Sequence, residues 1–163
     1  MRSRLKKVFI RAAKPRDYAA CRRMANQKEN REGLGFVSRI VFNDFAARQS
    51  KDSRYILLVA EDGQGKVVGF ARALRLLNGT QTTLHEICRD MACKGGGVGR
   101  ALLKKVEDMS RSHGIARFFL KVPDGIGAAK AYERFGFKRV GIESPQDFPG
   151  RKRRLKLYEK ELV

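Results

Sequence analysis

The sequence predicts a single α/β domain, and three observations favour this fold class. The chain has 163 residues, which is enough to bury one hydrophobic core without disulfides or metals. Strand-like and helix-like apolar patterns alternate along it. Between Gln81 and His113, a strand-like segment leads through a glycine-rich turn directly into a helix-like one. We therefore expect one mixed α/β domain over residues 1–163.

The first half of the chain is expected to form two helices and three strands. Pro15 suits the first turn of a helix, and Tyr18, Cys21 and Met24 follow it at helical spacing. The polar residues 28–35 are expected to form a loop. The predicted elements are a strand over 8–12, a helix over 15–27, a helix over 37–49, and strands over 55–60 and 67–74 joined by a turn at 62–65.

The second half begins with a predicted turn at 77–79. Its longest helix is marked by an apolar stripe at helical spacing: Val98, Leu102, Val106 and Met109. Gly114 follows the stripe and suits a helix end. The predicted elements are a strand over 81–90, a helix over 98–113, a strand over 116–122, a helix over 127–135, and strands over 137–140 and 155–162 joined by a basic, proline-containing connection.

The chain is strongly basic, with 36 Lys and Arg against 17 Asp and Glu and a formal net charge of +19 at pH 7. Much of this charge lies near the two ends, in 2–7 and 151–156. Such a field favours anionic partners, which include nucleic acid, ribosomal particles, acidic proteins and anionic cofactors. Because this attraction is largely non-specific, charge alone does not choose among them.

Composition argues against several other kinds of protein. The apolar fraction of 42% is ordinary for a soluble domain, and no apolar run approaches the length of a membrane span. Three cysteines form neither an even set nor a CxxC pair, so a reducing, cytoplasmic setting is expected. With only two histidines, a metal site is not expected.

The glycine-rich turn is suited to bind a phosphate group. Amides in the first turn of a helix lack partners inside the helix, and the helix dipole adds partial positive charge there. Glycines allow close approach of the backbone, and Lys94 and Arg100 flank the turn with full charges. No Ser or Thr follows as in a P-loop, and Leu102 replaces the last glycine of a dinucleotide fingerprint. We interpret the turn as a diphosphate cradle; a tight turn that serves only the backbone is the alternative.

Two motifs in the second half of the chain resemble those of the GNAT superfamily of N-acetyltransferases, which transfer an acetyl group from acetyl-CoA to an amine. One is Lys94-Gly95-Gly96-Gly97-Val98-Gly99, which is similar to the family's pyrophosphate motif. The other is Ala128-Ala129-Lys130-Ala131-Tyr132-Glu133-Arg134-Phe135-Gly136-Phe137. The resemblance covers nearly the whole chain. It implies a single-domain GNAT-like fold with a central, mostly antiparallel sheet of six to seven strands flanked by about four helices.

The resemblance also implies acetyl-CoA as cosubstrate and assigns the residues that would bind it. The backbone of 87–89 would pair with the pantetheine arm as an extra strand, and the amides of 95–100 would bind the diphosphate. Gly125 stands where an asparagine often binds the cofactor arm in the family. The implied cofactor-binding residues are Ile87, Cys88, Arg89, Lys94, Gly95, Gly96, Gly97, Val98, Gly99, Arg100, Gly125 and Tyr132.

Tyr132 matches the family's tyrosine and is implied as the general acid that protonates the departing sulfur. A phenol with an ordinary pKa of about 10 is protonated at neutral pH. The base is left open between His85 and Glu86 on the preceding strand. Since side chains alternate along a strand, only one of the two is expected to point into the cleft. A Cys88 nucleophile is a weaker alternative, because nothing nearby in the sequence indicates an activated thiol.

The sequence thus predicts an acetyl-CoA-dependent N-acetyltransferase that acts on a primary amine of a protein or small molecule by direct attack in a ternary complex. The acceptor is expected near 28–36 and the second helix, with Phe36 and Arg39 as contacts, and the charge favours an acidic acceptor or particle. The alternatives are a catalytically weak GNAT-fold module that binds nucleic acid through its basic termini, or a sensor of acetyl-CoA. We expect a cytoplasmic monomer or homodimer without membrane association.

Overall fold

The structure is a computed structural model that describes residues 7–30, 39–76, 79–93, 97–123, 128–148 and 151–162, with only the backbone of 39–42, 145–148 and 151–153 described. The elements follow the predicted order, and most bounds differ by one or two residues. They are β1 (Phe9–Ala12), the short 3-10 helix η1 (Pro15–Asp17), α1 (Tyr18–Ala25), α3 (Arg39–Gln49), β2 (Tyr55–Glu61), β3 (Val67–Arg75), β4 (Gln81–Arg89), α4 (Val98–Ser112), β5 (Arg117–Pro123), α5 (Ala128–Arg134), β6 (Lys138–Phe148) and β7 (Arg151–Glu161).

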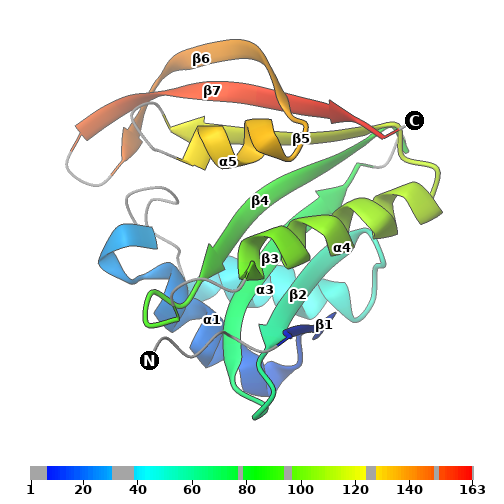
Figure 1. Ribbon diagram of the computed structural model, residues 1–163, viewed down its shortest axis with the longest axis vertical. Helices are drawn as coiled ribbons and strands as arrows, with labels where there is room; N and C mark the ends of the chain where they lie inside the picture. Colours follow the sequence, from blue (N-terminus) through cyan, green and yellow to red (C-terminus); the bar gives the residue numbers. More distant parts are fainter. Residues whose placement is uncertain are drawn as a thin grey trace.

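The strands form one seven-stranded sheet in the order β1-β2-β3-β4-β5-β7-β6. All neighbouring strands are antiparallel except β4 and β5, which are parallel. Within the described ranges, four helices have seven or more residues and cover both faces of the sheet (Figure 1). This arrangement confirms the predicted fold class. None of the described helices is long and apolar enough to cross a lipid bilayer.

Two predictions about local structure are wrong. The connection expected between 140 and 155 is instead the far part of a long hairpin, in which β6 and β7 pair from Lys138 opposite Glu159 to Phe148 opposite Arg151. Pro145 is tolerated because β6 is the edge strand and its register shifts between Glu143 and Gln146. Residues 28–30, which were expected in a loop, are helical.

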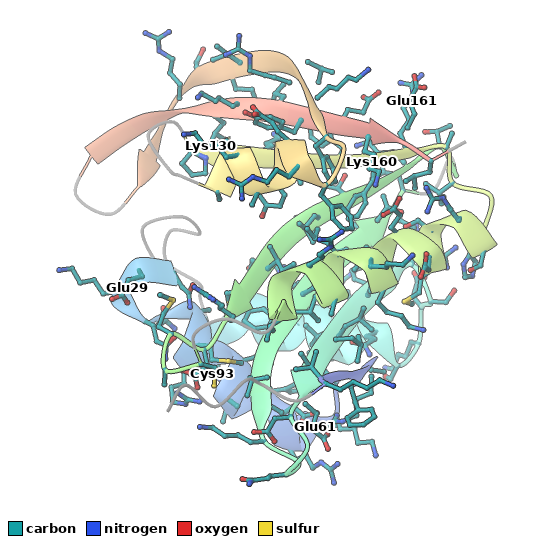
Figure 2. The ribbon with its side chains drawn as sticks, viewed as in Figure 1. Glu29, Glu61, Cys93, Lys130, Lys160 and Glu161 are labelled. Carbon is teal, nitrogen blue, oxygen red and sulfur yellow. The ribbon has the colours of Figure 1, made fainter. Side chains whose placement is uncertain are left out.

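The core consists of two apolar clusters, one on each face of the sheet. On one face α4 buries the predicted stripe of Val98, Leu102 and Val106. On the other, α1 and α3 pack Met24 and Phe45 against the sheet. Central strands such as β2 are buried on both faces, which explains their unbroken apolar runs. Many charged side chains lie at the surface, among them Glu29, Lys130 and Glu161, which are labelled in Figure 2.

The sheet opens between its two parallel strands. β4 and β5 pair only from Gln81 opposite Arg117 to Leu84 opposite Leu120. Beyond these pairs, β4 continues beside β3 alone and β5 continues beside β7. The edge of β4 over residues 85–89 therefore has no strand partner on this side among the described residues.

Candidate active site

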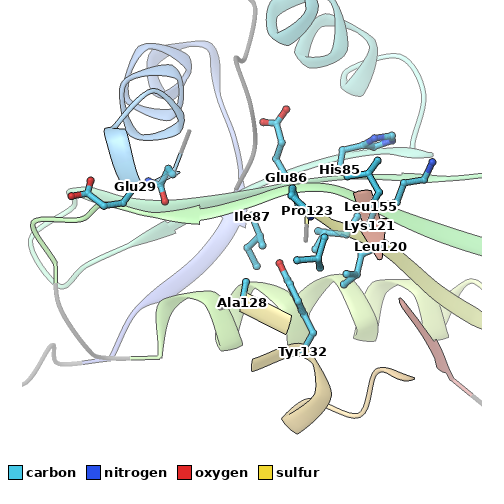
Figure 3. A pocket seen from close by; sticks show the side chains of 13 residues that line it. Glu29, His85, Glu86, Ile87, Leu120, Lys121, Pro123, Ala128, Tyr132 and Leu155 are labelled. Atoms are coloured by element: carbon cyan, nitrogen blue, oxygen red, sulfur yellow. The ribbon is translucent and has the colours of Figure 1, made fainter. Parts of the chain in front are cut away.

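Two cavities lie at the opening between β4 and β5. The strand cavity, of about 300 Å³, is lined mainly by 84–87 of β4 and 120–123 of β5 (Figure 3). The helix cavity, of about 320 Å³, lies between the first turns of α4 and the helix α5. Ile87, Ala128 and Tyr132 line both cavities, so the two are adjacent.

The start of α4 has the features expected of the diphosphate cradle. Gly97 precedes the helix with a left-handed φ of +66°, which glycine adopts without strain, and it offers no side-chain cap. The amides of 98–100 therefore stay free of partners inside the helix. Gly99 and Arg100 line the helix cavity. The predicted residues Lys94, Gly95, Gly96 and Gly125 lie outside the described residues.

Gly69 of β3 lets α4 begin close to the sheet. A Cβ at this position would lie 2.5 Å from Val98 Cγ1 and 3.0 Å from the carbonyl oxygen of Cys88. The Val98 side chain is buried in this contact, so only its backbone is available to a ligand. The cradle is thus packed directly onto the strands that lead to it.

The three residues at the end of β4 have different environments. Ile87 lines both cavities, whereas the Cys88 side chain is buried in the core on the other face. The carbonyl of Arg89 accepts a hydrogen bond of 3.0 Å from Asn30 Nδ2. Burial and the neighbouring Glu86 raise the pKa of the Cys88 thiol well above its ordinary value. A protonated, enclosed thiol argues against the alternative of a cysteine nucleophile.

The turn after β4 is held by Asp90. Its carboxylate accepts hydrogen bonds from Gln27 Nε2 at 2.9 Å, the Ala92 amide at 3.1 Å and Arg23 Nη2 at 3.2 Å. Burial alone would raise the pKa of Asp90, but these hydrogen bonds and the positive charge of Arg23 lower it. Asp90 is therefore an ionised structural residue below the cradle.

Tyr132 extends from α5 into the cleft between the cavities (Figure 3). Its ring packs edge-on against Phe137, with 5.9 Å between ring centroids. Its hydroxyl has no hydrogen-bond partner in the described part of the chain. Burial, together with the nearby Cys88 thiol, raises the pKa of Tyr132 to about 12. The phenol is therefore protonated across the neutral range.

The end of α5 is fixed by Lys160, which sequence reasoning missed. Its Nζ donates a hydrogen bond of 2.8 Å to the carbonyl of Phe135 and lies 2.9 Å from Glu107 Oε1 on α4. The same ammonium lies 4.4 Å from the centroid of the Phe135 ring. Lys160 thus joins β7, α4 and α5 behind Tyr132. Its separation from the motif in the chain left no signal for this role.

His85 and Glu86 both line the strand cavity, so the prediction that only one would point into the cleft is wrong. The register pairs Arg72 with Glu86 and Ala73 with Leu84, which makes His85 the extra residue of a β-bulge. A bulge locally breaks the alternation of side chains. In Figure 3 both side chains lie on the same side of β4, opposite Tyr132.

The two candidate bases differ in their surroundings. His85 keeps an exposed edge, but loss of surrounding water and the positive charges of Arg72 and Lys121 lower its pKa to about 4. Glu86 is 5% exposed, and burial raises its pKa against the opposing effect of Arg72. Arg72 Nη2 donates a hydrogen bond to Glu86 Oε1, while Oε2 is buried and has no partner among the residues that the structure describes.

Several residues that line the helix cavity were not singled out from the sequence. Leu103, Ala131 and Phe135 give it apolar walls, and Arg134 adds a second cation beside Arg100. The last three lie within the 128–137 motif, so the motif located them without identifying their role. No group of three or more His, Cys, Asp or Glu within the described ranges is arranged to bind a metal ion.

Comparisons with known proteins agree with this geometry. A profile of the Acetyltransferase (GNAT) family matches residues 18–137. Streptothricin acetyltransferase of Streptomyces lavendulae is 30% identical over 102 residues, which are 62% of this chain and 53% of that protein. The chain therefore spans about half the length of this curated relative.

Solved structures of similar fold cover nearly the whole chain. The ribosomal-protein-S18-alanine N-acetyltransferase of Escherichia coli is 25% identical, with a TM-score of 0.74 over 96% of this chain and 95% of that one. The yncA protein of Salmonella typhimurium, solved with its cofactor acetyl-CoA, is 23% identical, with a TM-score of 0.75 over 97% of this chain and 95% of that one. Because the family profile covers well over half of the sequence, this chain belongs to the GNAT family of acetyltransferases.

Proposed function

We propose that this chain transfers the acetyl group of acetyl-CoA to a primary amine by direct attack in a ternary complex. The observation that carries the proposal is the position of Tyr132 between two different cavities. One is bordered by the free amides at the start of α4, and the other by the buried carboxylate of Glu86. At this junction the phenol can assist cleavage of the thioester C–S bond, while the carboxylate can assist formation of the amide C–N bond.

The helix cavity fits a long thioester with a diphosphate. The amides of Gly99 and Arg100 would bind phosphate oxygens, and the side chains of Arg100 and Arg134 would add positive charge. A Cβ built on Gly97 or Gly99 would meet nothing within 4 Å, so both glycines leave open space at the cradle. The unpaired edge of β4 near Ile87 would pair with the amide-rich arm. When bound, acetyl-CoA supplies an acetyl group activated as a thioester.

Glu86 is the base in this proposal. An amine attacks only in its neutral form, so an ammonium must first lose a proton. The free Oε2 of Glu86 would accept that proton, directly or through a water. His85, with a pKa of about 4, is the weaker base and would act as a neutral neighbour of the amine.

Tyr132 is the residue that stabilises the departing sulfur in this proposal. With a pKa of about 12, Tyr132 holds its proton more tightly than a thiol, whose ordinary pKa is about 8.5. Its contribution would therefore be a hydrogen bond that strengthens as negative charge develops on the sulfur. Holding both reactants at this junction would supply much of the remaining acceleration.

The acceptor would enter beside residues 28–30, since Glu29 and Asn30 line the strand cavity. The two relatives named for an acceptor act on different molecules, streptothricin and the alanine of a ribosomal protein. We propose an acceptor that is acidic or lies on an acidic particle, because the chain carries a net charge of +19.

All three cysteines are free, which fits a reducing cytoplasm.

The proposal is tested by release of free thiol from acetyl-CoA in the presence of proteins, peptides, amino acids, amines, streptothricin and aminoglycosides. We expect at least one primary amine to be acetylated, and micromolar acetyl-CoA to raise the melting temperature. Tight, salt-sensitive RNA binding without any effect of acetyl-CoA would favour the alternative of a nucleic-acid-binding module. Binding of acetyl-CoA without acetylation of any of the amines offered would favour the alternative of an acetyl-CoA sensor.

A further inference from the structure

A buried ion pair lies beside the strand cavity. Arg72 of β3 stands opposite Glu86 of β4 in the strand register and donates a hydrogen bond to its Oε1. The two side chains are 13% and 6% exposed, so both charges are largely removed from water. Burying two charges is costly and adds little to stability compared with apolar residues. Because stability alone does not explain the pair, we infer that it acts in the cavity that Glu86 lines.

α3 fixes the guanidinium of this pair from one side. The ring centroid of Phe45 lies 4.8 Å from Arg72 Cζ, which is a cation–π contact. The same ring meets the ring of His85 edge-on, with 6.2 Å between centroids. Because Phe45 is buried in the core, Arg72 is held in a single place rather than moving freely at the surface.

Two polar atoms of the pair lack partners. Arg72 Nε and Glu86 Oε2 are buried and make no hydrogen bond among the described residues. Buried polar atoms are nearly always hydrogen-bonded, so an unpartnered one in a cavity wall marks a place for a ligand or water. Since Arg72 occupies Oε1, Oε2 is the oxygen of Glu86 that an incoming group can use.

We propose that Arg72 is a positioning residue for acetyl transfer: it holds Oε1 of Glu86 and leaves Oε2 to take the proton of the attacking amine. This inference rests on the proposed function. In the step, an N–H bond of the ammonium breaks and its electron pair stays on nitrogen. The proton forms an O–H bond with Oε2, directly or through one water. Arg72 stays charged throughout, because a guanidinium is not deprotonated in proteins.

The groups around the pair leave Arg72 as the charged partner of Glu86 within the described ranges. The Lys121 ammonium of β5 affects His85, but it is paired with Glu143 at 2.8 Å. The other neighbours are uncharged at neutral pH: Cys21 of α1, Phe45 of α3, His85 and Cys88 of β4, and Tyr132 of α5. Burial raises the pKa of Glu86, and among the charged groups Arg72 is the one that lowers it.

The first test measures the charge of Glu86 without any acceptor. Protein carrying ¹³C-labelled glutamate carboxyls is titrated by NMR, and the Glu86 signal is assigned by its loss in Glu86→Gln. The control is Arg75→Met, since Arg75 lies on the same strand and bonds to Ser53 instead. We expect the pKa of Glu86 to rise by about 1–3 units in Arg72→Met, as loss of an adjacent positive charge predicts, and to stay unchanged in Arg75→Met. An unchanged pKa in Arg72→Met would overturn the proposal.

The second test uses Arg72→Lys, which keeps the charge but loses the planar fork and is less disruptive to folding. Thiol release is measured with streptothricin, with lysine and with a peptide that begins with alanine. We expect kcat to fall about 10–100-fold, the cost of a misplaced group, with little change in KM for acetyl-CoA. Added to Glu86→Gln, the same substitution should cause no further loss, because both act on one step.

The outcomes separate this inference from the proposed function. If Glu86→Gln is slow while Arg72→Lys matches the wild type, the inference is wrong and the base assignment stands. If Arg72→Lys lowers kcat equally with and without Glu86, Arg72 acts independently and the inference is again wrong. A fully active Glu86→Gln variant would overturn the base assignment, and with it the role of Arg72.

Discussion

The ionisable side chains of the strand cavity have pKa values set by burial and by one another. Burial raises the pKa of Glu86, lowers the pKa of His85 to about 4 and raises the pKa of Tyr132 to about 12. The cavity therefore holds a carboxyl group paired with Arg72, and at neutral pH it also offers a neutral imidazole and a protonated phenol. Groups whose surroundings move their pKa values apart are typical of a site that accepts one proton and donates another.

Replacing Tyr132 with Phe tests its role as donor to the sulfur. Loss of the hydroxyl should lower kcat by about 100-fold or more, as removal of a hydrogen-bond donor to developing negative charge does, while KM for acetyl-CoA changes little. The matched control is Tyr55→Phe on β2, which lies outside both cavities. Steady-state thiol release measures both variants. Full activity of Tyr132→Phe would refute the assignment.

The pH profile of kcat/KM tests the base. Glu86 works only when ionised, so the rate should fall as pH drops through its raised pKa, which lies above the ordinary value of 4.5. Glu86→Gln should remove this acid limb along with most of the activity. A limb near pH 4 that disappears in His85→Gln would assign the base to His85 instead, since the pKa of His85 is about 4.

At the scale of elements, the site depends on how α4 and α5 are set against the opened strands. Gly97→Ala should lower the free energy of unfolding by about 1–2 kcal/mol, because alanine is strained at positive φ, and should weaken acetyl-CoA binding. Gly99→Ala is the matched control for stability alone, because Gly99 also lines the helix cavity: its Cβ meets nothing within 4 Å, and alanine favours the helix. Denaturant unfolding compares the two variants, and calorimetric titration measures acetyl-CoA binding by Gly97→Ala. Equal losses of stability in the two variants would contradict the role given to Gly97.

The junction of Lys160 with α5 makes a separate prediction. Lys160→Met should lower the free energy of unfolding by about 1–3 kcal/mol, because it removes the hydrogen bond to the Phe135 carbonyl and one of the two cations beside the buried Glu107. The loss should not be larger, because Arg111 still pairs with Glu107 at 2.8 Å. Because Tyr132 sits on the released helix, kcat should fall as well. Lys104→Met, at an exposed pair with Asp108, should change neither quantity. A destabilised variant with unchanged kcat would limit Lys160 to a structural role.

The sequence predicted elements whose signals are local. The stripe of Val98, Leu102 and Val106 located α4, and the 128–137 motif located Tyr132. The bulge at His85 could not be predicted, because it depends on how β3 pairs with β4. The link between Arg72 and Glu86 joins residues 14 positions apart, and no motif connects them. The long hairpin of β6 and β7 was missed because Pro145 interrupts a strand pattern unless it lies at an edge.

At the scale of the whole molecule, strand β4 lies between the two side chains proposed for catalysis. Glu86 and Tyr132 lie on opposite sides of β4 in Figure 3, at the place where β5 diverges. The helix cavity opens between α4 and α5, and the strand cavity includes residues that follow α1. An amine and a thioester could thus approach from different sides and meet at one opening, as a ternary complex requires.

The net charge of +19 predicts which acceptors are used. A polyamine such as spermidine should be a poor acceptor at low salt, because it is repelled, whereas an acidic peptide should be attracted. Raising the salt from about 0.05 to 0.5 M, which shortens the screening length, should lower kcat/KM for the peptide and raise it for spermidine. Thiol-release kinetics with both acceptors measure this. Efficient spermidine acetylation at low salt would contradict the prediction.

The central claim is that acetyl-CoA binds between α4 and α5 with its thioester beside Tyr132. A crystal structure of the protein with acetyl-CoA tests it most directly. We expect the diphosphate on the amides of 97–100, the arm along the free edge of β4, and the sulfur within hydrogen-bonding distance of the Tyr132 hydroxyl. Acetyl-CoA bound elsewhere, or bound here with its sulfur turned away from Tyr132, would contradict the claim.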